Sequence, residues 1–394
     1  MKPDPIRPPT ESGPLRIALV LQNSDPTLGG LESWTRGLAD WLVTRGHQVT
    51  LVAARTGAGH TSARVAFFED SADPWTRARL VAARLEDLDV DLVHDTGTGF
   101  QADVLQPQTG SRLINLERSD AALTPTARVR DWLNPRRRLW LEQMRRLEAA
   151  QFADPDRLIA VSAMVRDQIA ARHGLDARRI TVIHNGVETG RFAPSDLATR
   201  RAAARAAWRL DGTLVFLLVA NNFHLKGVTG AVRALARLAG DLPHARLAVV
   251  GSGDPTPYKR LARFLGVADR VRFLGRIEAI EDALAAADVA LQPTLHDACS
   301  LTTLEGLASG LPTITTVANG AAELITEDRE GYVVRSGDDT AALATVMARM
   351  ADPATRERLG RAARSLALCH CLEQKHGLIE AFYRRRLRLR PGPR

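Results

Sequence analysis

The stretch HDACSLTTLEGLASGLPTITT, residues 296–316, carries two acidic residues, Asp297 and Glu305, on either side of an expected helix start. It follows VALQPT (289–294), which is typical of a buried strand, and it runs into a further β-branched stretch. Backbone N–H groups are unpaired at the start of a helix and carry partial positive charge. Residues 298–301 are therefore candidates for holding a phosphate.

Each of the two acids has two interpretations. A carboxylate about one turn into the helix, as at Glu305, can accept two hydroxyls such as those of a ribose, and Asp297 can bind a second hydroxyl-bearing ring. The loop would then hold a sugar, a diphosphate and a nucleoside in a row. The spacing fits equally well a helix-capping Asp297 and a surface Glu305.

Outward from this stretch, strand-like apolar runs alternate with amphipathic helical patterns, which predicts a parallel α/β architecture. The runs include RIALVLQ (16–22), QVTLVAA (48–54), VDLVHDT (90–96), DRLIAVSA (156–163), RITVIHNG (179–186), TLVFLLVANN (213–222), ARLAVVGSG (245–253), VRFLG (271–275) and PTITTV (312–317). The pattern restarts after about 187–200. We therefore predict two doubly wound domains, residues 1–193 and 194–394, with a C-terminal helix in the second and ligands in the cleft between them.

Composition predicts a globular protein without a membrane span. A chain of 394 residues with 45% hydrophobic residues suits two soluble domains, and its longest apolar run, LVFLLVA (214–220), is far short of a membrane span. The first 14 residues lack the apolar core of a signal peptide, and three cysteines favour a reduced, cytoplasmic setting. All but four of the 53 basic residues are arginine, a bias typical of genome composition, so the net charge of +8 does not indicate nucleic acid.

Two further loops follow predicted strands. In ANNFHLKGV (220–228), Lys226 can neutralise a phosphate leaving group, and Asn222 is a further polar side chain that can contact a ligand. The alternative is a solvated lysine at a helix start. Gly29 and Gly30, after the first strand, let the backbone approach a ligand closely, although an ordinary tight turn explains them as well.

The stretch 127–152 interleaves arginines with Trp132 and Trp140, a pattern that suits the surface of an anionic bilayer. An amphipathic helix packed on its own domain fits it equally well. His94, at a strand end, is interpreted either as a ligand-facing side chain or as a structural histidine. Cys369-His370-Cys371 lacks further ligands at zinc spacing, and no metal or other cofactor is predicted.

Taken together, the motifs resemble glycosyltransferase family 4, the retaining nucleotide-sugar transferases of the GT-B fold. The resemblance covers nearly the whole chain and is closest to bacterial lipopolysaccharide core enzymes of the glucosyltransferase I type. The matching motifs are GGLE (29–32), AVSAMVRDQIA (160–170), VIHNGVETGRF (182–192), LKGV (225–228), VGSGD (250–254), VRFLGRIE (271–278), the acids at 297 and 305, GLASGLPTITT and NGAAELI (319–325).

The resemblance implies a role for each matching residue. Asp297 stands where the family has a glutamate that contacts the donor sugar, Glu305 matches the ribose-binding glutamate, and Lys226 matches the phosphate-binding lysine. The remaining implied contacts are the diphosphate-binding amides of Ala298, Cys299, Ser300 and Leu301, the base-holding Arg276 and Ile277, and the donor-closing loop of Gly29 and Gly30. Asn221 replaces an arginine that is frequent in the family, so this departure and Asp297 bear on which donor is bound.

The sequence thus predicts a retaining, metal-independent enzyme that moves a sugar from a nucleotide diphosphate sugar to a glycan or lipid-linked acceptor in cell-envelope synthesis. The setting would be the cytoplasm, with peripheral contact at the inner face of the membrane. Two alternatives stay open. One is a GT-B nucleotide-sugar epimerase or hydrolase, and the other is a non-catalytic glycan-binding relative.

Overall fold

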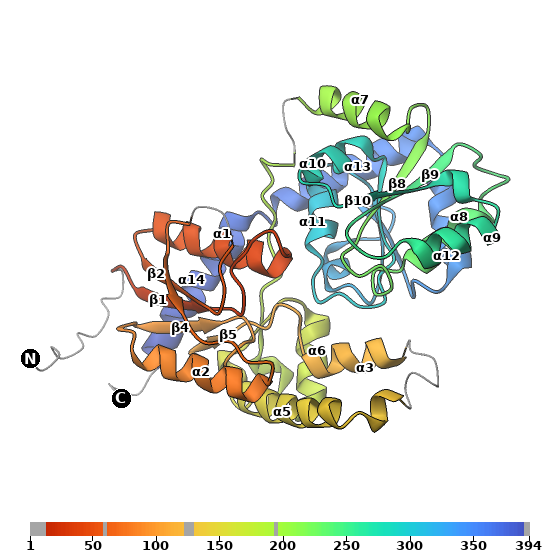
Figure 1. Cartoon of the computed structure of the whole chain (residues 1–394). Helices are drawn as coiled ribbons and strands as arrows, with labels where there is room; N and C mark the ends of the chain where they lie inside the picture. The colour runs from red at the N-terminus through yellow and green to blue at the C-terminus, as the bar shows by residue number, and fades with distance from the viewer. Residues whose placement is uncertain (1–12, 58–60, 122–129, 193–195, 390–394) are drawn as a thin grey trace, which may run out of the picture. The chain divides into compact units, whose positions relative to one another are not determined.

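The computed structural model describes residues 13–57, 61–121, 130–192 and 196–389, and its chain forms two compact units (Figure 1). The first unit contains the residues up to Ile183 together with those from His376 onward, and the second runs from His184 to Lys375. Residues 1–12, in which the sequence predicted no signal peptide, lie outside the described residues. The part of the chain that the structure describes contains no helix long and apolar enough to cross a bilayer.

The first unit is built on a five-stranded parallel sheet in the order β3-β2-β1-β4-β5. Its strands are β1 (Arg16–Val20), β2 (Gln48–Ala53), β3 (Arg64–Phe67), β4 (Leu92–Asp95) and β5 (Val104–Leu105). A two-stranded parallel sheet joins β6 (Ile159–Ala160) to β7 (Thr181–Val182). The central strands are apolar and buried, as parallel strands covered on both faces require.

The helices of the first unit begin at sequence signals that their residues explain. The helices are α1 (Gly30–Thr44), α2 (Pro74–Glu86), α3 (Arg112–Ala121), α5 (Pro135–Gln151) and α6 (Ala163–His173), to which most of α14 (Leu372–Arg388) is added. Asp73 caps α2 by accepting a hydrogen bond from the Thr76 amide, and Pro74 occupies the first turn, where its missing N–H costs nothing.

The second unit contains a six-stranded parallel sheet in the order β10-β9-β8-β11-β12-β13. Its strands are β8 (Leu214–Val219), β9 (Ala245–Val250), β10 (Val271–Gly275), β11 (Val289–Gln292), β12 (Thr313–Thr316) and β13 (Gly331–Val334). Along the chain, β9 and β10 follow β8 toward one edge of the sheet. The next strand, β11, then pairs with the other side of β8, and β12 and β13 continue to the opposite edge. The carboxyl ends of β8 and β11 therefore form the switch point at which doubly wound sheets bind ligands.

Helices cover both faces of this second sheet, and the core lies between them and the strands (Figure 1). They are α7 (Leu197–Trp208), α8 (Val228–Arg237), α9 (Thr256–Phe264), α10 (Ile280–Ala286), α11 (Leu301–Ala308), α12 (Thr340–Arg349) and α13 (Pro353–Leu368). The strands are Val- and Leu-rich, and Phe216, Leu218, Leu247 and Leu291 are fully buried. The predicted α/β class with two doubly wound domains is confirmed.

The domain division differs from the predicted one at both ends of the second unit. The first break falls at Ile183 and His184 instead of near residue 193. The last helix, α14, was expected in the second domain, yet from His376 onward it packs in the first unit, where Tyr383 is fully buried beside His94. An amphipathic pattern predicts that a helix buries one face but does not say against which sheet.

Candidate functional site

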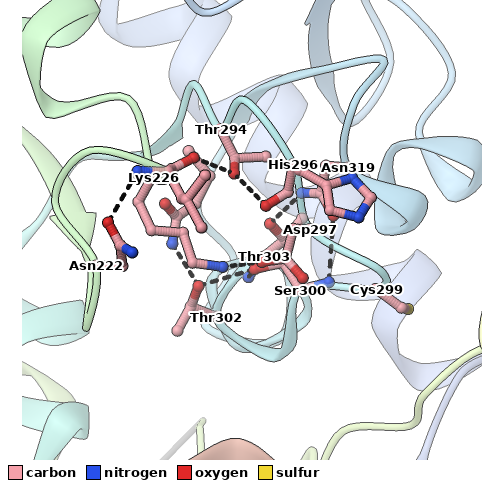
Figure 2. A network of polar contacts seen from close by, with 12 residues as sticks. Asn222, Lys226, Thr294, His296, Asp297, Cys299, Ser300, Thr302, Thr303 and Asn319 are labelled. Carbon is pink, nitrogen blue, oxygen red and sulfur yellow. Dashed lines mark hydrogen bonds and ion pairs between the residues drawn. The ribbon is translucent and has the colours of Figure 1, made fainter. Parts of the chain in front are cut away.

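The loops that leave β8 and β11 meet at the switch point of the second sheet, and an ion pair joins them (Figure 2). Lys226, from the β8–α8 loop, directs its ammonium group at an Oδ atom of Asp297, from the β11–α11 loop. The two side chains are 23% and 14% exposed, so the pair is partly shielded from water. Two residues predicted from separate motifs are thereby brought into direct contact.

The position of Lys226 is set by the residues around it. Gly227 has φ +76°, a conformation that side chains disfavour, and a Cβ there would overlap the carbonyl oxygen of Pro293. The Leu225 carbonyl accepts a 2.7 Å hydrogen bond from the Thr294 hydroxyl and another of 2.7 Å from the Leu295 amide. The lysine loop is therefore fixed directly onto the strand end that carries Asp297.

Asn222 shapes the same loop. Its side-chain oxygen accepts a 3.1 Å hydrogen bond from the Leu225 amide, and its carbonyl accepts a 3.0 Å bond from the Lys226 amide. The side chain is exposed. Asn222 thus holds the turn that presents Lys226, and its predicted contact with a substrate stays a prediction.

Asn319 holds the other loop in place, as Figure 2 shows. This residue is 1% exposed and uses both ends of its amide. Its oxygen accepts bonds of 3.2 Å from the Ser300 amide and 3.0 Å from the Ala321 amide, and its nitrogen donates 2.9 Å bonds to the hydroxyls of Thr303 and Thr315. A single buried side chain therefore links the start of α11 to β12.

The start of α11 is the predicted anion site. Ser300 caps the helix by accepting a 3.3 Å hydrogen bond from the Thr303 amide. Ala298 and Cys299 are buried, Leu301 is half-buried, and the Ser300 amide already donates to Asn319. Burial raises the pKa of the Cys299 thiol to about 12, so this cysteine remains a neutral thiol at neutral pH. The start of α11 is therefore polar, and the neutral Cys299 thiol does not repel an anion there.

Glu305 lies inside α11 and is only partly accessible. Removal of water from around the carboxyl group raises its pKa to about 7, the positive charge of Arg191 opposes this rise, and the negative charge of Glu281 adds to it. Arg191 itself forms an ion pair with Glu281. The predicted ribose-binding carboxyl therefore lies in a cluster of two acids and one arginine, which no local sequence pattern indicated.

The other predicted residues are spread more widely. Arg276 and Ile277 follow β10, the third strand from β11 in sheet order, with Arg276 exposed and Ile277 half-buried. Gly29 and Gly30 belong to the first unit, where Gly30 begins α1. The contacts of the structure therefore hold Asn222, Lys226, Asp297 and the start of α11 in one network.

His94 is a structural residue of the first unit. It is 0% exposed, its Nδ1 lies 2.5 Å from the Tyr383 hydroxyl, and its ring packs edge-on against Trp34. Burial lowers its pKa to about 3. Of its two interpretations, the buried core histidine is correct. Across the described ranges, no three His, Cys, Asp or Glu side chains are grouped so as to hold a metal ion.

The arginine-rich stretch has two different faces. Residues 127–129 lie outside the described residues. On α5, Met144 and Leu147 are buried in the unit, and Trp140, expected at a membrane surface, packs against them. Trp132, Leu133 and Leu139 are 68%, 62% and 59% exposed, beside the exposed Arg136, Arg138 and Arg145. The helix thus packs as an ordinary amphipathic helix and also leaves an exposed basic and apolar face.

The comparisons with known proteins agree with this architecture. Residues 28–191 match the family model of Glycosyltransferase Family 4, and residues 201–366 match that of glycosyl transferases group 1. A D-inositol 3-phosphate glycosyltransferase of Streptomyces avermitilis is 34% identical over 231 residues, which are 55% of this chain and 49% of the relative. A glycogen synthase of Mycobacterium tuberculosis is 30% identical over 225 residues, 56% of this chain and 52% of the relative. The chain spans about half the length of the curated relatives it matches.

Solved structures match over nearly the whole chain. WaaG, a glycosyltransferase involved in lipopolysaccharide biosynthesis, has a TM-score of 0.73 at 21% identity and is covered over 98% of its length by 92% of this chain. A sucrose-phosphate synthase from Thermosynechococcus elongatus has a TM-score of 0.74 at 20% identity, covering 94% of this chain and 98% of that one. Anabaena HepE, solved in complex with UDP and glucose, has a TM-score of 0.72 at 18% identity, and the match covers 94% of this chain and 99% of that one. At these identities the matches show a shared GT-B fold.

Proposed function

Because the chain carries a Family 4 glycosyltransferase domain over residues 28–191 and a group 1 glycosyl transferase domain over 201–366, we propose that it transfers a sugar from a nucleotide diphosphate sugar to an acceptor hydroxyl. One observation carries the proposal. The Lys226–Asp297 ion pair lies where β8 and β11 end at the switch point, beside the start of α11. A cation, a helix start and two carboxyl groups are what a diphosphate linked to two hydroxyl-bearing rings requires.

The residues of the second unit divide the donor between them. Lys226 and the amides of residues 298–301 bind the diphosphate, and Glu305 accepts the ribose hydroxyls. Asp297 accepts hydroxyls of the transferred sugar and, in the ligand-free protein, serves as the counter-ion of Lys226. A bound diphosphate gives Lys226 a second anionic partner, so donor binding releases part of the Asp297 carboxylate for the sugar. Arg276 and Ile277 contact the base.

Transfer proceeds with retention of the anomeric configuration in this proposal. The bond between the sugar C1 and the diphosphate oxygen breaks, and the acceptor oxygen forms its bond to C1 on the same face. The acceptor proton passes to the departing phosphate oxygen. Lys226 and the α11 amides stabilise the negative charge that develops on the diphosphate, and such preorganised groups contribute about 10²–10³-fold each to the rate. The mechanism assigns no step to a metal ion.

A glycan or lipid-linked acceptor is proposed for the first unit, in cell-envelope polysaccharide or lipopolysaccharide synthesis. Two observations support this setting. WaaG shares the fold and is involved in lipopolysaccharide biosynthesis. The outer face of α5 combines arginines with exposed Leu139, and exposed Trp132 lies just before the helix, which suits reversible contact with the inner face of the cytoplasmic membrane.

Mass spectrometry of the reaction products tests the proposal. The protein is incubated with UDP-, GDP- and ADP-sugars and with glycan and lipid-linked acceptors, and Lys226→Met serves as the impaired variant. We expect an acceptor that gains one sugar mass, at a kcat at least about 10²-fold lower in the variant. Free sugar without acceptor product would indicate a hydrolase, an isomerised donor would indicate an epimerase, and unchanged donors throughout would indicate a binding protein. Each of these three results contradicts the transferase.

A further inference from the structure

Lys375, in the first turn of α14, is a largely buried lysine, and no carboxylate among the described residues acts on its charge. The residue is 9% exposed and belongs to the second unit. Desolvation lowers the pKa of the ammonium, and its ionisable neighbours in the described parts of the chain include Cys299, Cys371 and His370. Buried charges in proteins are normally paired, because removing an ion from water is costly. The ammonium nitrogen of Lys375 keeps some access to solvent, so an anionic ligand can reach it and offset the cost of its partial desolvation.

The backbone places this lysine with little freedom. The Lys375 amide donates a 3.2 Å hydrogen bond to the Cys371 carbonyl, and the Val187 amide and carbonyl bond to the His370 carbonyl at 3.1 Å and the Leu372 amide at 3.0 Å. A Cβ added to Gly186 would lie 2.8 Å from the Cα of Leu372 and 3.0 Å from the Cγ of Lys375, so the glycine allows the first turn of α14 to approach this loop closely. Loop 184–187 and the start of α14 thus form one fixed support.

The same support reaches the predicted phosphate loop. Asn185 is 4% exposed, and its amide nitrogen donates a 3.1 Å hydrogen bond to the Cys299 carbonyl. In the described part of the chain its side-chain oxygen is buried without a hydrogen-bond partner. The Cys299 thiol lies within electrostatic range of Lys375 and of Asp297. Lys375 therefore lies near the loop that precedes α11, although 149 positions separate it from Lys226 in the sequence.

The charge of the site makes a second cation necessary. The charge of Lys226 is balanced by Asp297, and that of Arg191 by Glu281. The Lys226 loop contributes a neutral side chain at position 221. A nucleoside diphosphate carries at least two negative charges, and its binding to a neutral ion pair would leave them largely uncompensated. Lys375 supplies positive charge on which no carboxylate of the described residues acts.

We propose that Lys375 is a second cation for the diphosphate of the donor and that Asn185 fixes the Cys299 loop beside it. This inference rests on the proposed function and deepens it, because it assigns a diphosphate contact to a segment outside the two strand-end loops. The ligand class is a nucleoside diphosphate, with inorganic pyrophosphate as its base-free analogue.

Calorimetry with three variants tests this inference. UDP, GDP, ADP and pyrophosphate are titrated into wild type, Lys375→Met, Lys375→Arg and the control Lys259→Met, which removes an exposed lysine of the same unit. We expect Lys375→Met to weaken nucleoside diphosphate and pyrophosphate binding about tenfold or more, an effect the size of one charge-assisted contact. Lys375→Arg should retain most of the affinity, and Lys259→Met should remain within about twofold of wild type.

The outcomes separate this inference from the function on which it rests. If wild type binds a nucleoside diphosphate and Lys375→Met binds it equally well, the Lys375 contact is refuted and the transferase proposal stands. If wild type binds none of the probes, both fail. Circular dichroism and thermal melting check the fold of each variant. Should Lys375→Met not fold, Lys375→Gln, neutral and polar, replaces it with the same expected loss.

Discussion

The carboxyl group of Glu305 is close to the midpoint of its titration at neutral pH. Its pKa of about 7 results chiefly from burial, against which Arg191 acts. An exposed glutamate titrates near 4.3. Since the folded-state value is the higher one, this group stabilises the fold at low pH, and its contribution is lost as the pH rises through 7. The same rise in pH creates the carboxylate that the proposed ribose contact uses.

The proposed ribose contact should therefore strengthen with pH. We predict that the affinity advantage of wild type over Glu305→Gln for a nucleoside diphosphate grows about tenfold between pH 6 and pH 8, because an ionised acceptor bonds hydroxyls more strongly. Calorimetry at pH 6, 7 and 8 measures it. The diphosphate also titrates near pH 6, but this affects wild type and Glu305→Gln equally. The ratio of their two affinities therefore cancels the effect of the diphosphate titration. A ratio independent of pH would exclude Glu305 from ribose binding.

The residue types of the site were predictable from sequence, but their partners were not. Lys226 and Asp297 each follow a strand with a loop and a helix, and that pattern is visible in the chain. Their ion pair joins residues 71 positions apart, and it depends on the pairing of β8 with β11. The same holds for Asn319, Arg191 and Lys375, whose roles depend on tertiary neighbours and leave no local signal. Asn319 lies in the matched NGAAELI motif and Arg191 in the matched VIHNGVETGRF motif, but neither motif shows which residues these side chains contact.

At the scale of elements, α5 carries two surfaces with different roles. Its inner face, with Met144 and Leu147, is part of the first unit's core. Its outer face presents Leu139 among arginines, and exposed Trp132 lies just before the helix. Arg137 is an exception, because its guanidinium forms an ion pair with Asp120 and its charge is already balanced. The sequence could show that basic and apolar residues alternate, whereas only packing shows which of them remain exposed.

We predict reversible, salt-sensitive binding of the protein to anionic vesicles through this outer face. Replacing Arg136, Arg138 and Arg145 with serine should weaken binding at least about tenfold at low salt, since each basic residue near such a surface contributes about 1 kcal/mol. Vesicle co-sedimentation at low and high salt measures the effect, which screening should abolish at about 1 M salt. The control replaces Arg233, Arg260 and Arg263, exposed arginines of the second unit, and should bind like wild type. Wild type that stays in the supernatant at low salt would refute membrane contact.

At the scale of the molecule, the alternation of strands and helices was sufficient to predict two doubly wound units, because each parallel strand needs a crossover helix. The course of α14 was not predictable. Its side chains contact residues far away in sequence, as in the Tyr383–His94 bond across 289 positions. The second unit is consequently continuous in sequence, whereas the first is completed by the chain's last helix.

The central claim is that the loops after β8 and β11 bind a nucleoside diphosphate. Hydrogen exchange with mass spectrometry, with and without saturating UDP, GDP or ADP, locates such binding directly. The account predicts that one of these nucleotides slows amide exchange in 224–228 and 297–305, while α5 exchanges as before. Exchange left unchanged in both loops by every nucleotide, or protection confined to other segments by a nucleotide that binds, would contradict it.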